Sequence, residues 1–114
     1  MSIQAGIDIA VTAITQNDGA SAVTLQMRNP ITLQRDGVLL RLYCGSPERQ
    51  LTEVIAASEA GMAQARRVAA EQGVAQIIPV PGGFPGRETV TVTVPVNTKL
   101  PASATCRAEM RGVW

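Results

Sequence analysis

One stretch of the sequence, Cys44-Gly45-Ser46, combines residue types that could support nucleophilic chemistry. We predict a helix directly after it, and a helix N-terminus stabilises a thiolate and binds anions. A nucleophilic cysteine also needs a base, and the chain has no histidine, the commonest general base. We therefore interpret Cys44 as the end of a buried strand and Ser46 as a helix cap. A small enzyme or ligand-binding subunit with a βαβ core at Cys44–Ser46 is kept as an alternative.

The remaining polar and glycine-rich patterns predict no catalytic, cofactor-binding or metal-ligating residue. The glycines Gly82, Gly83 and Gly86 lack the lysine of a phosphate-binding loop, and a strand follows where a helix should begin. The carboxylates occur singly, with no spacing typical of acid–base pairs or metal sites: Asp8, Asp18, Asp36, Glu48, Glu53, Glu59, Glu71, Glu88 and Glu109. We expect a protein that is not an enzyme, without cofactor, metal or small-molecule substrate.

The composition argues against several classes of partner. The formal net charge is +1 and Lys99 is the only lysine, so we expect no nucleic-acid binding and no membrane surface binding. One Phe, one Tyr and one Trp are too few for most base-stacking or sugar-binding sites. No apolar run is long enough to span a membrane, and no signal peptide is evident. We expect a single globular domain over residues 1–114, made in the cytoplasm.

A single long helix is predicted over about residues 47–72. Ser46 is the expected N-cap, Pro47 suits the first helical position, and Gly73 suits the left-handed residue after the end. Gly61 interrupts this helix, and it indicates either a kink or the close approach of a neighbouring backbone. The stripe that would face the core follows the 3.6-residue period: Leu51, Val54, Ile55, Ser58, Met62, Ala65 and Ala69.

Alternating apolar residues and turn signals predict about six strands. Asn17-Asp18-Gly19 is typical of a hairpin turn. A short continuation over 31–34 and a second turn at 35–37 would make the first third a β-meander. The expected strands lie at 3–15, about 23–27, 38–44, 74–80, 89–96 and about 106–111, and the last two look like hairpin partners. Pro79 and Pro81 limit the strand at 74–80 to an edge or a short segment. A parallel βαβ arrangement of this strand with 38–44 is left open.

These elements predict an α+β fold. We expect a mainly antiparallel β-sandwich or small barrel with the helix packed on it. Cys44 and Cys106 are predicted to be buried thiols, although a bridge between them is left open if two strands bring them together. The loop from Pro81 to Gly86 is the expected mobile element.

The compact, nearly neutral, β-rich chain favours a role in an assembly. In size and class only, it resembles small β domains of tailed-phage virions: capsid decoration proteins, head-tail connectors and tail proteins. The resemblance implies a non-enzymatic structural protein that contacts its own copies and other particle subunits, and whose final location is a virion. The main alternative is an immunoglobulin-like binding or adhesion module, which a Cys44–Cys106 disulfide would favour and a long helix would disfavour.

Overall fold

The computed structural model describes residues 6–114, apart from the side chain of Asn17, so Ile3 and Ala5 of the predicted first strand lie outside it. The fold is α+β, with seven strands and one helix in the described residues. The elements are β1 (Asp8–Asn17), β2 (Ala20–Arg28), β3 (Gly37–Cys44), β4 (Arg49–Ala57), α1 (Met62–Gln72), β5 (Gln76–Pro79), β6 (Thr89–Val96) and β7 (Cys106–Val113).

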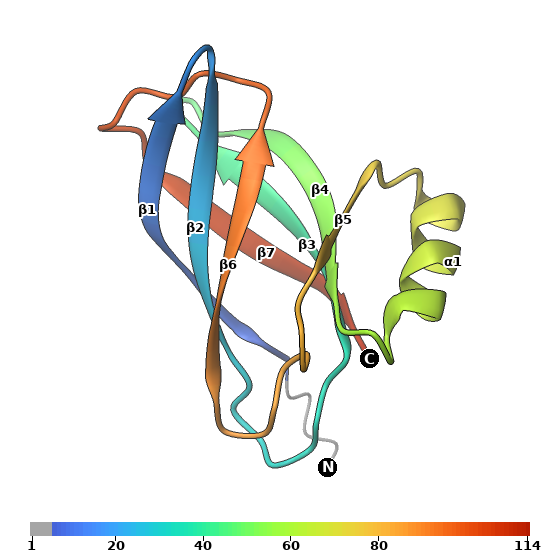
Figure 1. Ribbon diagram of the computed structural model, residues 1–114. Helices are drawn as coiled ribbons and strands as arrows, with labels where there is room; N and C mark the ends of the chain where they lie inside the picture. The colour runs from blue at the N-terminus through green and yellow to red at the C-terminus, as the bar shows by residue number, and fades with distance from the viewer. Residues whose placement is uncertain (1–5) are drawn as a thin grey trace.

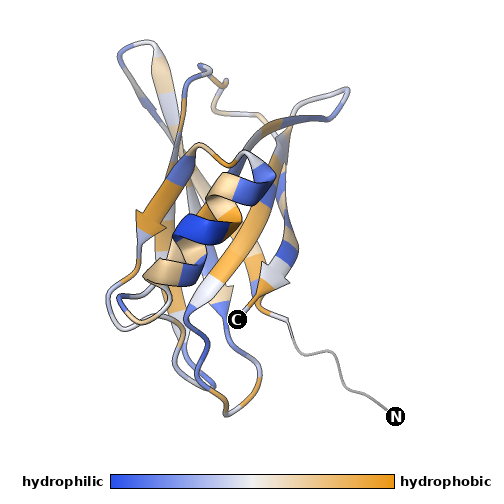
Figure 2. Ribbon diagram, turned by 90° about the vertical axis from the view of Figure 1, so that its right-hand side faces the viewer, coloured by the Kyte–Doolittle hydropathy of each residue, from blue (hydrophilic) through white to orange (hydrophobic). Residues whose placement is uncertain are grey.

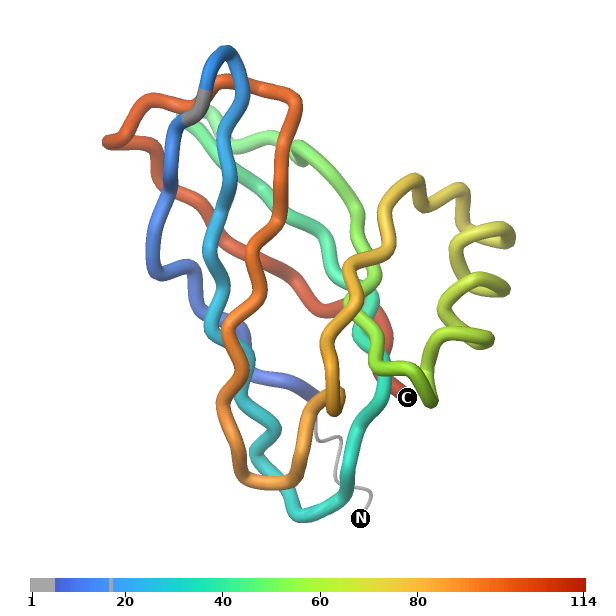
Figure 3. Tube along the Cα trace, viewed as in Figure 1, coloured from blue at the N-terminus to red at the C-terminus, as the bar shows by residue number. Residues whose placement is uncertain are grey.

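Two sheets face each other and form a small sandwich (Figure 1). The first sheet has the order β1-β2-β6, and the second has the order β5-β4-β3-β7. All the pairings are antiparallel except β4 with β5, which is parallel. Figure 3 follows the chain from the first sheet into the second after β2, back for β6, and again into the second sheet for β7.

The main core lies between the two sheets. Alternate residues of each inner strand point into it, as the twofold period of a strand requires. Leu25 and Val94 from one sheet and Leu40 and Val54 from the other have no exposed surface. A second, smaller cluster lies between the outer face of the four-stranded sheet and α1: Leu39, Ile55, Ala57, Ala65 and Val74. Figure 2 looks onto this helix, which crosses in front of the strands.

The predicted helix is wrong over its first half. Arg49–Ala57 forms strand β4, and the helix begins only at Met62. The reason is that residues 54–57 are buried on both faces, Val54 toward the other sheet and Ile55 toward α1. A strand buried on both faces is a continuous apolar run, which periodicity does not distinguish from a helix.

The predicted helix boundaries fail at one end and are confirmed at the other. Ser46 and Pro47 lie in the turn between β3 and β4, so neither starts a helix. The Oγ of Ser58 accepts a hydrogen bond from the Gly61 N–H at 3.1 Å, near the true helix start. Gly61 is the N-cap, and a Cβ there would lie 2.3 Å from the Asp36 carbonyl oxygen, which confirms the predicted backbone approach. Gly73 ends the helix with φ 69°.

The long-range strand pairings also differ from the predictions. The turn at Asp18-Gly19 is confirmed, and β1 pairs with β2. The first third is not a meander, however, because β3 joins the other sheet, and β6 and β7 lie in different sheets and are not hairpin partners. The segments 31–34 and 35–36 are neither a strand nor a turn, apart from an isolated bridge between Arg35 and Phe84, and Gly37 already belongs to β3. A parallel crossover does occur, but β5 pairs with β4 rather than β3.

Candidate functional site

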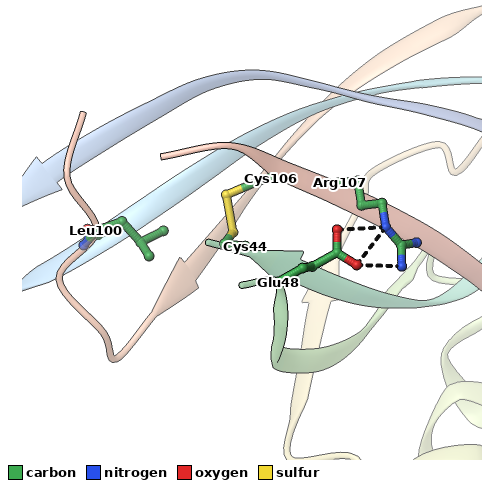
Figure 4. Close-up of a disulfide and its surroundings, with 6 residues drawn as sticks. Cys44, Glu48, Leu100, Cys106 and Arg107 are labelled. Atoms are coloured by element: carbon green, nitrogen blue, oxygen red, sulfur yellow. Dashed lines mark hydrogen bonds and ion pairs between the residues drawn. A yellow bond between two sulfur atoms is a disulfide. The ribbon is translucent and has the colours of Figure 1, made fainter. Parts of the chain in front are cut away.

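The first feature of the candidate site is a disulfide between Cys44 and Cys106. The two cysteines are directly opposite each other on β3 and β7, with their Cα atoms 4.1 Å apart (Figure 4). The prediction of two buried thiols is therefore wrong. It failed because the pairing depends on β3 and β7 being neighbours, although 62 residues separate the cysteines in sequence.

The disulfide changes the meaning of the Cys44-Gly45-Ser46 stretch. The sulfur of Cys44 is bonded and its residue is 1% exposed. Gly45 and Ser46 form a hairpin turn instead of preceding a helix, so no helix dipole acts on this sulfur. A thiolate nucleophile at Cys44 would first require reduction of the disulfide.

Charged side chains cover the outer face of β7 next to the disulfide. The guanidinium of Arg107 donates hydrogen bonds of 2.8–3.0 Å to the Glu48 carboxylate (Figure 4). It also lies over the Tyr43 ring, 4.4 Å from the centroid. These hydrogen bonds to Glu48 raise the pKa of Arg107 above its ordinary value. Farther along the strand, Glu109 accepts a hydrogen bond from Arg111 at 3.0 Å.

Two hollows flank this corner of the sandwich. One, of about 380 Å³, is lined by Cys44, Leu51 and Leu100 among others. The other, of about 330 Å³, separates β1 from the chain leading into β7. Leu100 is buried beside the disulfide, and its N–H donates to the Ser21 Oγ at 2.8 Å. Arg49 and Lys99 line the first hollow, and no charged residue lines the second. Both hollows are open to solvent, so they fit a contact surface better than a small-molecule pocket.

The hydrogen-bond pattern between β7 and β3 follows from one backbone bond next to the first residue of β7. The Gly45 N–H donates to the Thr105 carbonyl oxygen at 3.0 Å, which makes this a hydrogen-bonded pair. The next pair, Cys44 with Cys106, is then a non-hydrogen-bonded pair, and its Cα separation of 4.1 Å agrees with the shorter spacing of that class. Hydrogen-bonded and non-hydrogen-bonded pairs alternate along an antiparallel ladder.

This alternation decides which backbone groups of β7 face away from β3. Arg107 and Glu109 are opposite Tyr43 and Arg41, and their N–H and C=O groups point to β3. The backbone groups of the intervening residues point to the other side, where the described residues contain no further strand: Cys106, Ala108 and Met110. The β7 edge, defined by these three residues, is a row of backbone donors and acceptors that pair with no strand among residues 6–114.

The opposite end of the sandwich is built from two interlocked loops, residues 29–36 and 80–88. The buried Asn29 side chain donates to the carbonyl oxygens of Leu33 and Phe84 at 2.7 and 2.9 Å. Phe84 is 1% exposed, so the predicted mobile loop is anchored in the core at this residue. Leu33 is the exposed large hydrophobic residue of the described chain. The loop glycines serve close packing, since a Cβ at Gly86 would lie 2.3 Å from the Thr32 carbonyl oxygen.

The carboxylates remain scattered in the fold. Glu48 and Glu53 are paired with Arg107 and Arg41, respectively. Among residues 6–114 no group of three metal-ligating side chains gathers. In the same part of the chain, no helix has the length and apolar character needed to cross a membrane.

Comparisons of the chain with protein-family models, with curated proteins and with solved structures found no match. The geometry of the fold is therefore the basis for assigning a function. In the sequence, the alternating charges at 107, 109 and 111 indicate only an outward face. The strand order, which has no local signal in the sequence, makes this face part of a sheet edge.

Proposed function

We propose that this protein is a non-enzymatic protein-binding module of the immunoglobulin-like type. The observation that carries the proposal is the strand order. Immunoglobulin sandwiches place strands A, B and E in one sheet and F, C and C′ in the other. Here β1, β2 and β6 occupy the first set of positions, and β7, β3 and β4 occupy the second. The helix, the parallel strand β5 and the disulfide are departures from that pattern. Cys44 and Cys106 join two strands of one sheet, whereas the immunoglobulin disulfide joins strands B and F of opposite sheets.

The disulfide supports the proposal that this module works in an oxidising environment. Disulfides persist in oxidising compartments and at cell or particle surfaces, and are rare in the reducing cytosol. Cys44 and Cys106 join neighbouring strands of the sheet, so the bond secures β7 to β3. A module that presents the outer strand of a sheet to partners benefits from having that strand fixed in place.

A site-specific cross-linking experiment tests the binding function. A photo-reactive amino acid is placed at the exposed Arg111 on β7, and in a matched control at the exposed Glu71 on α1. In the native source, we expect the Arg111 variant to form one defined protein adduct and the Glu71 variant to form none. Absence of any adduct at β7, or equal labelling at both positions, would contradict the proposal.

A virion subunit, our sequence-based expectation, is the second candidate function. The feature that favours it is that β7 pairs on one side only within the described chain, which leaves an edge for subunit contacts. The redox state of the cysteines separates the two proposals. Alkylation of the native protein before purification should find no free thiol in an exported module, and two free thiols in a particle assembled in the cytosol.

A further inference from the structure

The β7 edge points to a specific kind of partner. Its free backbone groups, on Cys106, Ala108 and Met110, match those of another extended strand. The side chains of the same residues face inward and are only partly buried against the core. In an immunoglobulin sandwich, strand F has a further strand on the side away from C. Among the described residues β1 lies near β7 without pairing with it, and the Ile7 N–H donates to the Met110 Sδ at 3.2 Å.

We propose that β7 pairs antiparallel with β7 of a second copy of this chain, with the twofold axis at Ala108. This proposal rests on the protein-binding function and names its partner. Ala108 would lie opposite Ala108 of the second copy, and Cys106 opposite its Met110. All of these residues have backbone groups that face the free edge, so each pair exchanges both N–H···O bonds. The two four-stranded sheets would then be continuous.

Charge complementarity and the regularity of the strand together favour this register. With the axis at Ala108, Arg107 lies opposite Glu109 of the second copy on both sides of the axis. With the axis at Arg107 or at Glu109, that residue would instead be opposite its own like charge. An axis at Met110 would also place opposite charges together, Glu109 with Arg111, but it falls where the register of β7 shifts. Like charges directly opposite each other destabilise strand pairing, whereas opposite charges stabilise it. A shift by a single residue along one strand would place edge-facing groups against groups already bonded to β3.

The side chains are already positioned for this contact. The Nε and Nη2 atoms of Arg107 are held by Glu48, while Nη1 lies 3.6 Å from Glu109 of its own chain. The side chains of Arg107 and Glu109 remain 51% and 35% exposed. The Arg107–Glu109 pair in the proposed register is a non-hydrogen-bonded pair, in which side chains of neighbouring strands lie closest. The fixed Arg107 side chain therefore loses little further rotamer freedom on pairing.

A charge-exchange experiment tests the register. Sedimentation of the wild type from about 10 μM to about 1 mM covers the affinity range expected for a small strand-to-strand interface. Glu109→Arg places Arg opposite Arg, and Arg107→Glu places Glu opposite Glu. We expect each variant alone to weaken dimerisation at least about tenfold. An equimolar mixture of the two restores opposite charges at both pairs and should form a heterodimer. Glu71→Arg, on the exposed face of α1, makes the same charge change and should dimerise like the wild type.

A charge-preserving variant makes the test independent of whether the charge-reversal variants fold. Arg107→Lys preserves the charge and introduces an amine for a zero-length cross-linker. In a mixture of isotope-labelled and unlabelled chains, we expect a mixed-isotope cross-link between positions 107 and 109. A wild type that stays monomeric, dimers that persist in both single variants, or the absence of that cross-link would each overturn the register. A cross-link from β7 to a different protein would overturn it too, while leaving the binding function standing.

Discussion

The two edges of the four-stranded sheet differ in almost every property that controls strand pairing. β5 has four residues, ends at Pro79 and is packed next to α1. β7 has eight residues and no proline, and no described strand pairs with its outer side. Short strands, prolines and covering helices protect sheet edges from association. The difference indicates that this fold protects one edge of the sheet and leaves the other available for a partner.

The edges of the three-stranded sheet are protected as well. β6 carries an exposed Pro95, which has no N–H to donate, and β1 has a register shift between Val11 and Ala13 that disturbs its ladder. The register of β7 also shifts, but only beyond Met110. Between Cys106 and Met110 the strand is regular, so this is the part we expect to pair.

Among the changes that test the difference between the two edges, removal of the disulfide should have the largest effect on stability. The double variant Cys44→Ala/Cys106→Ala releases β7 from β3 and should lower the free energy of unfolding by about 4 kcal/mol, from the entropy of closing the intervening loop. Chemical denaturation of the variant measures the change. The wild type under reducing conditions serves as the control and should lose a similar amount. A loss below about 1 kcal/mol in both would show that the bond does not hold β7.

Proline substitutions on β7 test which backbone groups face the free edge. Arg107→Pro removes an N–H that bonds to β3, and should lower the free energy of unfolding by about 3 kcal/mol. Ala108→Pro removes an N–H that faces outward, and should cost only about 1 kcal/mol while abolishing dimerisation. Thermal unfolding and sedimentation of the two variants measure both effects. The opposite order of stability would refute the hydrogen-bond pattern assigned to β7.

A pair of glycine variants compares the packing at α1 with that at β7. Gly61→Ala should lower the free energy of unfolding by about 2 kcal/mol, because its Cβ would lie 2.3 Å from the Asp36 carbonyl oxygen. Gly112→Ala is the matched control on β7, where the nearest atom is 3.8 Å away, and should change stability by less than about 0.5 kcal/mol. Equal effects in denaturant titrations would show that Gly61 does not mark a close contact.

The smallest effect is expected at the ion pair of Glu48 and Arg107. Both side chains are exposed, at 44% and 51%, so Glu48→Gln should lower the free energy of unfolding by less than about 1 kcal/mol. Added salt should reduce the difference between wild type and variant. A larger, salt-independent loss would mean that Glu48 has a structural role other than orienting Arg107.

Local signals in the sequence predicted much of this fold. Strands 38–44 and 89–96, the turn at Asp18-Gly19 and the helix end at Gly73 each follow from residues within a short window. Gly61 was predicted to mark either a kink or a close backbone approach, and the contact with Asp36 confirms the second. β4 was missed, because Val54 and Ile55 are buried on opposite faces and the run lacks the alternation of a half-buried strand.

The candidate site could not be predicted to the same extent. The Cys44–Cys106 bond and the free edge both depend on β7 lying next to β3, and the sequence contains no local signal for that pairing. The alternation of Arg107, Glu109 and Arg111 indicated an outward face, but the sequence did not show that this face borders an unpaired edge. Strand order, rather than any residue type, determines what these side chains can contact.

Amide hydrogen exchange of β7, resolved by residue in dilute and concentrated solution, tests the central claim most directly. In dilute protein, we expect the Ala108 amide to exchange rapidly and the neighbouring Arg107 and Glu109 amides slowly, because only the latter two bond to β3. In concentrated protein, exchange at Ala108 should slow by about tenfold or more while the amides of β5 are unchanged. A protected Ala108 amide in dilute solution, or an exchange rate that does not respond to concentration, would contradict the claim that β7 is the binding edge.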